Sequence, residues 1–166
     1  MMIRLAAAFA VLLLGLSACT PTGNSVTTNA TGAGTSRLSF GTSVDIANVG
    51  ARVSTLRAQN GVVRPVGHSA ALQAVAQAHA DTMARTGEFS HSGANGSTLA
   101  TRMRASGYTA CFAAENIAHG QTNIAQVFQD WMSSDGHRRN ILSPQATQFG
   151  FARNGTYSVL VLGRSC

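Results

Sequence analysis

The sequence predicts an α+β domain with an antiparallel sheet, and three observations support this prediction. Apolar residues recur three or four positions apart over most of residues 43–142, which is the spacing of one face of a helix. Near the C-terminus, two β-rich segments at 147–153 and 156–163 are joined by Asn154-Gly155, a strong hairpin signal. A further strand is expected at 111–118. Helices that come first and a hairpin that comes last indicate the α+β class.

The first two helices are predicted from apolar spacing and from their end signals. The first follows Ser43, a plausible N-cap, and ends at Asn60-Gly61. The second follows Ser69 and ends at Gly87. The residues expected to face inward are Ile46, Val49, Val53 and Leu56 in the first helix, and Leu72, Val75, Ala76, His79 and Met83 in the second.

Three shorter helices are expected in the middle of the chain. One runs from Ser97 to Ser106 and is capped by Gly107. The next starts near Thr122, and a helical turn then leads to Leu142 and is stopped by Pro144. The residues expected to face inward are Leu99, Met103, Ile124, Val127, Phe128 and Trp131.

The N-terminus resembles a lipoprotein signal peptide over residues 1–18. Arg4 precedes an apolar run from Leu5 to Leu16, which is short for a membrane span. The run ends in Leu16-Ser17-Ala18-Cys19, which resembles a bacterial lipobox. In such signals cleavage falls before the Cys, and Cys19 would then carry acyl chains such as palmitate. The alternative is an ordinary signal peptide cut near Ala18, which leaves Cys19 as a free thiol; we favour the lipoprotein.

The mature chain is expected to consist of a tether and one domain. Residues 19–42 are rich in Thr, Gly, Ser and Asn, which is typical of a flexible linker. The folded domain is expected over 43–166. The residue after Cys19 is Thr20 rather than Asp, which resembles outer-membrane sorting. The predicted location is therefore the cell envelope, on the periplasmic face of the outer membrane.

Charge and composition exclude several classes of protein. The chain carries a formal charge of +6 from 12 Arg and 6 acidic residues, and 45% of its residues are hydrophobic. That apolar fraction excludes a wholly disordered chain. No basic run exceeds Arg138-Arg139, so a nucleic-acid partner is not expected. We expect a weakly basic monomer whose N-terminal lipid is its contact with the membrane.

The three cysteines fit an exported protein. If lipid takes Cys19, then Cys111 and Cys166 remain as a pair in an oxidising compartment, where disulfides persist. Two buried free thiols are the alternative, but we favour the bridge. Such a bridge would contribute about 4 kcal/mol in the chain-entropy model.

Glu115 is the most informative candidate for a functional residue. It lies in a largely apolar strand candidate, where a carboxylate needs partners if it is buried. The alternative is an edge strand that leaves Glu115 in water. Among the five histidines, His91 and His137 lie in loop or turn settings, where functional residues gather. His79 is expected in the core, His68 at the surface, and His119 about 13 Å along the strand from Glu115.

Several motifs resemble the bacterial branch of the CAP superfamily, the group of cysteine-rich secretory proteins, antigen 5 and pathogenesis-related 1 proteins. The resemblance covers residues 49–163 and implies a three-layer α-β-α sandwich with a central antiparallel sheet. The matching segments are Arg57-Ala58-Gln59-Asn60-Gly61, Ala76-Gln77-Ala78-His79-Ala80, Phe89-Ser90-His91-Ser92, Gly107-Tyr108, Glu115-Asn116-Ile117-Ala118 and Trp131-Met132-Ser133-Ser134-Asp135-Gly136-His137-Arg138-Arg139-Asn140-Ile141-Leu142.

The same resemblance implies a cleft with two histidines and two acids, in which some members hold zinc. His91 and His137 match the two histidines, and Glu115 matches the first acid. The second acidic position is Ser134 here, with Asp135 next to it. The acidic set is therefore altered unless Asp135 substitutes. Two neutral histidines would bind zinc only weakly, because such a site lacks ligands.

Two hypotheses of function follow. The first is a non-enzymatic binding module whose His/Glu cleft takes a lipid, a glycan or a peptide of the cell envelope. The second is a metal-dependent or acid–base hydrolase, similar to a peptidase, that uses the same cleft. The chain contains neither a Gly-x-Ser-x-Gly nor a His-Glu-x-x-His motif. We favour the binding module on that ground.

Overall fold

The computed structural model describes residues 44–166. The predicted signal peptide at 1–18, Cys19, the tether at 19–42 and Ser43 lie outside these residues. Within 44–166, no helix combines the length and the apolar character needed to cross a bilayer. The elements are α1 (Ile46–Gln59), β1 (Gly67–His68), α2 (Ala70–Thr86), the 3₁₀ helix η1 (Ala94–Gly96), α3 (Leu99–Ala105), β2 (Ala110–His119), α4 (Ile124–Ser133), α5 (Asp135–Ile141), β3 (Gln148–Asn154) and β4 (Tyr157–Ser165).

The four strands of this domain form one sheet in the order β1-β3-β4-β2. The predicted hairpin is present: β3 and β4 pair antiparallel, and Gly155 occupies the turn with a φ of 57°. Asn154 pairs with Tyr157, so the turn lies one residue later than predicted. The sheet is not purely antiparallel, because the short strand β1 pairs parallel with β3. A strand of two residues carries no periodic signal, so the sequence could not reveal it.

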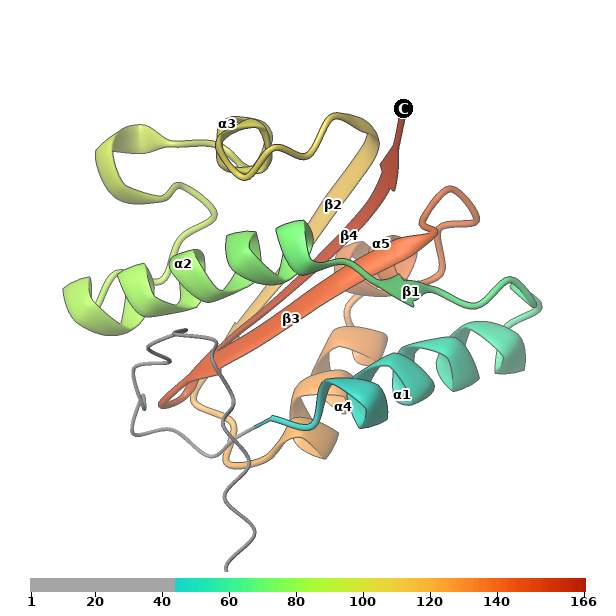
Figure 1. Ribbon diagram of the computed structural model, residues 1–166. Helices are drawn as coiled ribbons and strands as arrows, with labels where there is room; N and C mark the ends of the chain where they lie inside the picture. Colours follow the sequence, from blue (N-terminus) through green and yellow to red (C-terminus); the bar gives the residue numbers. More distant parts are fainter. Residues whose placement is uncertain (1–43) are drawn as a thin grey trace, which may run out of the picture. The chain divides into compact units, whose positions relative to one another are not determined.

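Helices cover both faces of the sheet, which confirms the predicted α-β-α sandwich (Figure 1). Side chains alternate between the faces along each strand. In β4, Leu160 and Leu162 pack with α1, α4 and α5, whereas Val159 and Val161 pack with α2 and α3. The sheet therefore separates two apolar cores, and β2 forms its outer edge beside α3 and α5.

Short polar side chains cap the helices near the predicted positions. The cap of α1 is Asp45 rather than Ser43, because the Asp45 carboxylate accepts from the N–H groups of Ala47 and Asn48. Ser69 caps α2 as predicted, and Gly87 ends that helix with a φ of 72°. The caps of α3 and α4 are Thr98 and Asn123, each one residue after the predicted start.

Helix α2 packs directly on the backbone of β3. A Cβ atom at Gly150 would lie 2.2 Å from the carbonyl carbon of Leu72, so only glycine permits this approach. The next residue of the helix, Gln73, donates its side-chain amide to the carbonyl of Phe151 at 2.7 Å and accepts from the N–H of Phe151 at 3.1 Å. Strand β1 pairs with β3 only as far as Phe149. Beyond this point, the Gln73 side chain forms hydrogen bonds with both the C=O and the N–H of Phe151.

Arg57 is a buried cation that ties α1 to the chain beyond α5. Its guanidinium donates to the carbonyl oxygens of Ile141 at 2.8 Å, Ser143 at 2.7 Å and Ala146 at 3.1 Å. No solvent reaches the residue, and this burial lowers the pKa of Arg57 from its usual value. Four carbonyl groups, including that of Arg64 at 3.3 Å, therefore replace the water that the guanidinium loses.

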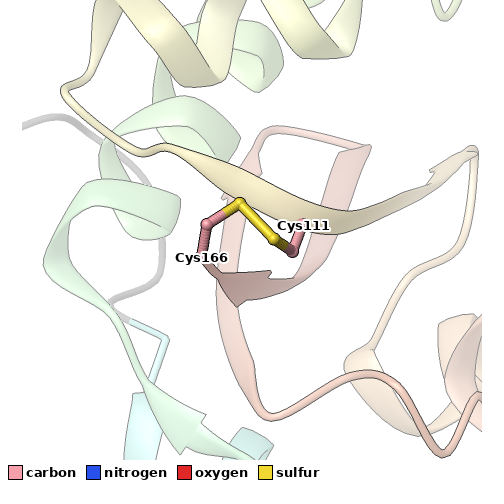
Figure 2. The surroundings of a disulfide bond; sticks show 2 residues. All are labelled: Cys111 and Cys166. Carbon is pink, nitrogen blue, oxygen red and sulfur yellow. A yellow bond between two sulfur atoms is a disulfide. The ribbon is translucent and has the colours of Figure 1, made fainter.

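The predicted Cys111–Cys166 disulfide is present and joins the start of β2 to the C-terminus (Figure 2). The two Cα atoms are 4.9 Å apart, within the range that a disulfide spans. Cys166 also donates its N–H to the carbonyl of Thr109. The bridge therefore fixes the first residues of the edge strand.

We predict that Arg57→Met lowers the free energy of unfolding by about 3 kcal/mol, because it leaves several buried carbonyl groups without a donor. Urea denaturation monitored by circular dichroism would measure this loss. The matched control is Arg164→Met, which removes an exposed guanidinium from β4 and should cost less than about 0.5 kcal/mol. Equal losses in the two variants would contradict the role given to Arg57.

Candidate functional site

Glu115 lies in the buried half of β2, opposite Val161 of β4. Its side chain is directed to the same face as Ile117, which belongs to the core formed with α2 and α3. Only 3% of the side chain is exposed. Glu115 is therefore a buried carboxylate and not an edge residue in water.

Three side chains from three parts of the chain surround this carboxylate. Arg102 of α3 places Nη2 2.6 Å from Oε2, and His91 of the loop after α2 places Nδ1 2.9 Å from Oε1. His79 of α2 lies further away, with Nε2 3.9 Å from Oε1. We call Glu115, Arg102, His91 and His79 the Glu115 cluster.

The hydrogen bond with Glu115 determines which ring nitrogen of His91 carries the hydrogen. A carboxylate can only accept, so Nδ1 of His91 carries the hydrogen of this bond. In the neutral ring, Nε2 then keeps its lone pair. Because 58% of the side chain is exposed, this nitrogen can accept a proton or bind a ligand. Glu115 therefore fixes the orientation of the His91 ring, as a carboxylate bonded to one ring nitrogen does for many functional histidines.

His79 closes the cluster from the core side. Its Nε2 donates to the carbonyl of Ser90 at 3.0 Å, and its buried Nδ1 has no hydrogen-bond partner among residues 44–166. Burial lowers the pKa of His79, while the charge of Glu115 acts in the opposite direction and that of Arg102 in the same direction. The sequence correctly predicts His79 in the core, but it gives no sign that this residue lies beside Glu115.

Arg102 does more than neutralise Glu115. Its Nη1 donates to the carbonyl oxygens of His91 at 3.1 Å and Ser97 at 2.9 Å, so the same guanidinium holds the loop that carries His91. The loop folds closely around it: a Cβ at Gly93 would lie 2.5 Å from Oγ of Ser97 and 3.2 Å from Nη1 of Arg102. Sequence reasoning missed Arg102. A buried Glu requires a cation, but no spacing rule identifies which of the 12 Arg supplies it.

His137 approaches β2 from its other side, on α5. Its carbonyl accepts from Nδ2 of Asn116 at 3.0 Å, and Asn140 donates to the Asn116 side chain at 2.9 Å and to the carbonyl of Glu115 at 3.3 Å. Burial lowers the pKa of His137, and the nearby charge of His91 lowers it further. The structure thus brings His137 within electrostatic range of His91, although no hydrogen bond joins the two rings.

The two residues near the altered acidic position do not supply a second carboxylate to the cluster. Asp135 is 78% exposed at its side chain and forms an ion pair with Arg138 at 3.0 Å. Ser134 precedes α5 in the N-cap position, without a capping bond from its side chain. Glu115 is therefore the carboxylate that the described residues bring to this place.

The residues present do not fit a three-ligand zinc site. Catalytic zinc commonly has three protein ligands. No group of three His, Cys, Asp or Glu residues in 44–166 is arranged to hold a metal ion. Both oxygens of Glu115 are already engaged, by His91 and Arg102. His91 could bind a metal through Nε2 while its Nδ1 stays on Glu115, but Glu115 would then orient this ligand and not supply a third one. Weak zinc binding by the two histidines alone stays a prediction.

A cavity of about 370 Å³ opens beside the cluster. One wall is the loop of His91 and the start of α3, and the other is β2. The residues that line it are His91, Ser92, Thr98, Leu99, Ala113, Ala114 and Glu115. His137 is not among them. A volume in this range and a mixed polar and apolar lining are typical of a site for a small ligand or part of a larger one.

Comparison with protein families gives one match that covers most of this domain. The model described as "CAP: Cysteine-rich secretory protein family" matches residues 51–161. An uncharacterised protein of Bacillus subtilis, YkwD, is 33% identical over 88 residues, which are 53% of this chain. The match spans only 34% of that relative's length.

Solved structures with the same fold come from several bacteria. An extracellular protein containing an SCP domain from Bacillus anthracis has a TM-score of 0.68 and 24% identity, over 72% of this chain and 40% of that one. An outer surface protein from Borrelia burgdorferi has a TM-score of 0.67 and 18% identity, over 74% of this chain and 93% of that one. A cysteine-rich secretory protein from Staphylococcus aureus has a TM-score of 0.61 and 18% identity, over 70% and 37%. These likenesses show the fold.

We predict strong coupling between Arg102 and Glu115 in a double-mutant cycle. Arg102→Met leaves a buried carboxylate without its cation and should lower the free energy of unfolding by about 3 kcal/mol or more. The double variant Arg102→Met/Glu115→Gln should be more stable than the sum of the single losses implies, by about 2 kcal/mol. Chemical denaturation of the four proteins would measure this coupling.

The exposed pair Asp135 and Arg138 provides the control for this cycle. Its two partners are at least half exposed, so their coupling should be below about 1 kcal/mol. Additive losses at Arg102 and Glu115 would show that the buried ion pair does not hold the cluster together.

We predict that stability falls as the pH falls below about 6.5, the ordinary histidine pKa. The folded protein has lowered pKa values at His79 and His137, so below that pH the unfolded chain binds more protons and acid favours unfolding. His79→Gln, which can still donate to Ser90, should flatten the dependence in urea titrations between pH 7.5 and pH 5. The exposed His68→Gln should not. An unchanged slope in His79→Gln would refute the contribution of His79.

Proposed function

This chain belongs to the cysteine-rich secretory protein (CAP) family, and from that premise we propose that it is a binding module of the cell envelope and not a hydrolase. The proposal rests on one observation: each carboxylate oxygen of Glu115 is in contact with a neighbouring side chain. Arg102 neutralises one oxygen at 2.6 Å, and His91 donates to the other at 2.9 Å. A general base must direct a lone pair at its substrate. Only 3% of the Glu115 side chain is exposed, and both of its oxygens face neighbouring side chains, so we assign it the role of a structural acceptor that positions these neighbours.

The groups that remain open suit ligand capture. The side chain of His91 is 58% exposed and lines the cavity, which also offers the hydroxyl groups of Ser92 and Thr98. Leu99 and Ala113 add apolar surface to the same cavity. A site with a few polar groups on an apolar lining can hold a lipid headgroup, a glycan or a peptide.

A hydrolase that uses the same cavity is the second candidate, and one observation favours it. A buried carboxylate that orients a histidine through Nδ1 leaves Nε2 as a potential general base, as in catalytic triads. Such a mechanism would not need Glu115 as a base or a metal. It would need a nucleophile or a water molecule at Nε2, and the exposed ring of His91 gives little exclusion of bulk water.

The location of the protein is part of the proposal. We place it in the cell envelope, with lipid on Cys19, the tether at 19–42 and the domain standing off the outer membrane on the periplasmic face. The lipobox-like Leu16-Ser17-Ala18-Cys19 supports the lipid, and the disulfide supports an oxidising compartment. Two of the proteins of similar fold are described as extracellular or as an outer surface protein.

We predict that the full-length protein, purified from the envelope in mild detergent, carries a bound molecule that mass spectrometry can identify after extraction. His91→Ala should reduce the amount of this molecule at least tenfold, because it removes the exposed nitrogen at the cavity. His68→Ala, which alters an exposed histidine on β1, is the matched control and should retain it. Equal amounts from the three proteins, or none from the wild type, would refute the proposal.

A further inference from the structure

We propose that the outer edge of β2, together with the groove beside α3, binds an extended peptide as an additional strand. The peptide would carry an acidic group at the end near Arg104. This inference deepens the proposed function and rests on it, since one part of the groove is the cavity beside His91 and Glu115.

The pairing of β2 with β4 determines which backbone groups face outward. The register is unbroken from Phe112 to His119, and just beyond it Gly120 donates to the carbonyl of Thr156. In an antiparallel ladder, this bond places His119 opposite Tyr157 in a pair that exchanges no hydrogen bonds. Every second residue before His119 therefore directs its N–H and C=O away from β4. These residues are Ile117, Glu115 and Ala113.

Side chains already occupy the outward carbonyl groups in the second half of β2. Trp131 donates to the carbonyl of Ile117 at 3.0 Å, and Asn140 donates to the carbonyl of Glu115 at 3.3 Å. Ala113 has the same orientation but is exposed, and no group among residues 44–166 outside the sheet bonds to its backbone. At Ala113 the first half of β2 thus presents a free edge, which is a template for another strand.

A groove runs along this free edge. Two cavities of about 360 and 370 Å³ adjoin each other, with Ala113 in the lining of both. Helix α3 forms the opposite wall, beside the first half of β2 in Figure 1. An extended chain between a strand edge and a helix would satisfy the Ala113 backbone, and its alternate side chains would enter the cavities. The residues that line the first cavity are Ala100, Met103, Arg104, Tyr108, Thr109, Ala110, Cys111, Phe112 and Ala113.

Two of the usual protections of an edge strand are missing here, because residues 110–114 carry no charge and no proline. A register shift between Ala110 and Phe112 interrupts the ladder before Ala113, so the regular edge open to a partner begins after it. The disulfide at Cys111 holds the segment to the end of β4, so the template is ordered before a partner arrives. Preorganisation of this kind lowers the entropic cost of binding.

The surroundings favour a single peptide strand over a second copy of the domain. The two cavities sit between β2 and α3, and α5 flanks β2 further along. A second copy would have to bring its own α3 and α5 into the space beside these helices, whereas a single strand needs only the width of the groove. Among the residues that line the two cavities, Arg104 is a cation, while the acid Glu115 is neutralised by Arg102. The positive charge of Arg104 at one end of the groove therefore favours a peptide with an acidic group at that end.

Fluorescence anisotropy on the full-length protein in mild detergent would test this inference. The probe is a blocked, labelled peptide of alternating Thr and Val that ends in Glu. Ala113→Pro removes the outward N–H without removing a ladder bond, and it should weaken binding at least tenfold. Ala113→Ser keeps the N–H and should change the affinity less than twofold.

Two further arms keep the test decisive if Ala113→Pro fails to fold. A probe N-methylated at alternate residues should bind the wild type at least tenfold more weakly, since it cannot complete the ladder. Arg104→Gln should weaken binding of the Glu probe severalfold but leave a Gln-ended probe unaffected. Hydrogen–deuterium exchange should show protection by the Glu probe at residues 110–115.

Several outcomes would overturn the inference. These are a wild type that does not bind the probe at millimolar concentration, equal affinity for the N-methylated probe, or protection elsewhere in the chain. A dimer in sedimentation that Ala113→Pro abolishes would assign the edge to a second copy instead. If the peptide tests fail while His91→Ala still loses its co-purified molecule, the proposed function stands and only the peptide class is wrong.

Discussion

One buried carboxylate organises the edge of this sheet. Glu115 lies almost out of contact with solvent, and a buried charge is tolerated only when opposite charge and hydrogen bonds compensate for the lost water. Arg102 and His91 supply that compensation from α3 and from the loop after α2. Because Arg102 also binds two carbonyl groups of this loop, the interaction positions His91 as well as Glu115. The polar site thus depends on the same contacts that join three segments of the fold.

Membership of the CAP family does not by itself assign an activity to this protein, because the same fold can carry different sites. In this chain, a histidine of α5 and a histidine of the loop after α2 lie on either side of β2, but the chemistry depends on what else is present. Here Asp135 turns to Arg138 in solvent, and Glu115 is engaged at both oxygens. The open groups are a histidine nitrogen and two hydroxyl groups in a cavity of mixed lining, and the outward backbone groups of Ala113. Such groups can recognise a ligand without changing it.

Local sequence patterns predicted most of the helices and strands, but they could not predict which residues from distant segments come into contact. Periodicity identified the helices because one apolar stripe faces each core, and Asn154-Gly155 identified the hairpin, although its turn is displaced by one residue. The two-residue strand β1 is too short to carry a pattern, so the mixed character of the sheet was missed. Glu115 stood out because an apolar strand rarely carries a carboxylate. Arg102 did not, since a solvent-facing arginine and a buried one look alike in a short helix; the closeness of His79 to Glu115 arises only when α2 packs on the sheet.

We expect Glu115 to hold a binding site together and to perform no hydrolysis. The most direct test incubates the full-length wild type and Glu115→Gln with a peptide and glycan fraction of the envelope and follows both by time-resolved mass spectrometry. The bound molecules should be recovered with unchanged mass, and Glu115→Gln should capture less of them. Cleavage products that accumulate with the wild type, and disappear in a Glu115→Gln protein that circular dichroism shows to be folded at the assay temperature, would contradict this expectation.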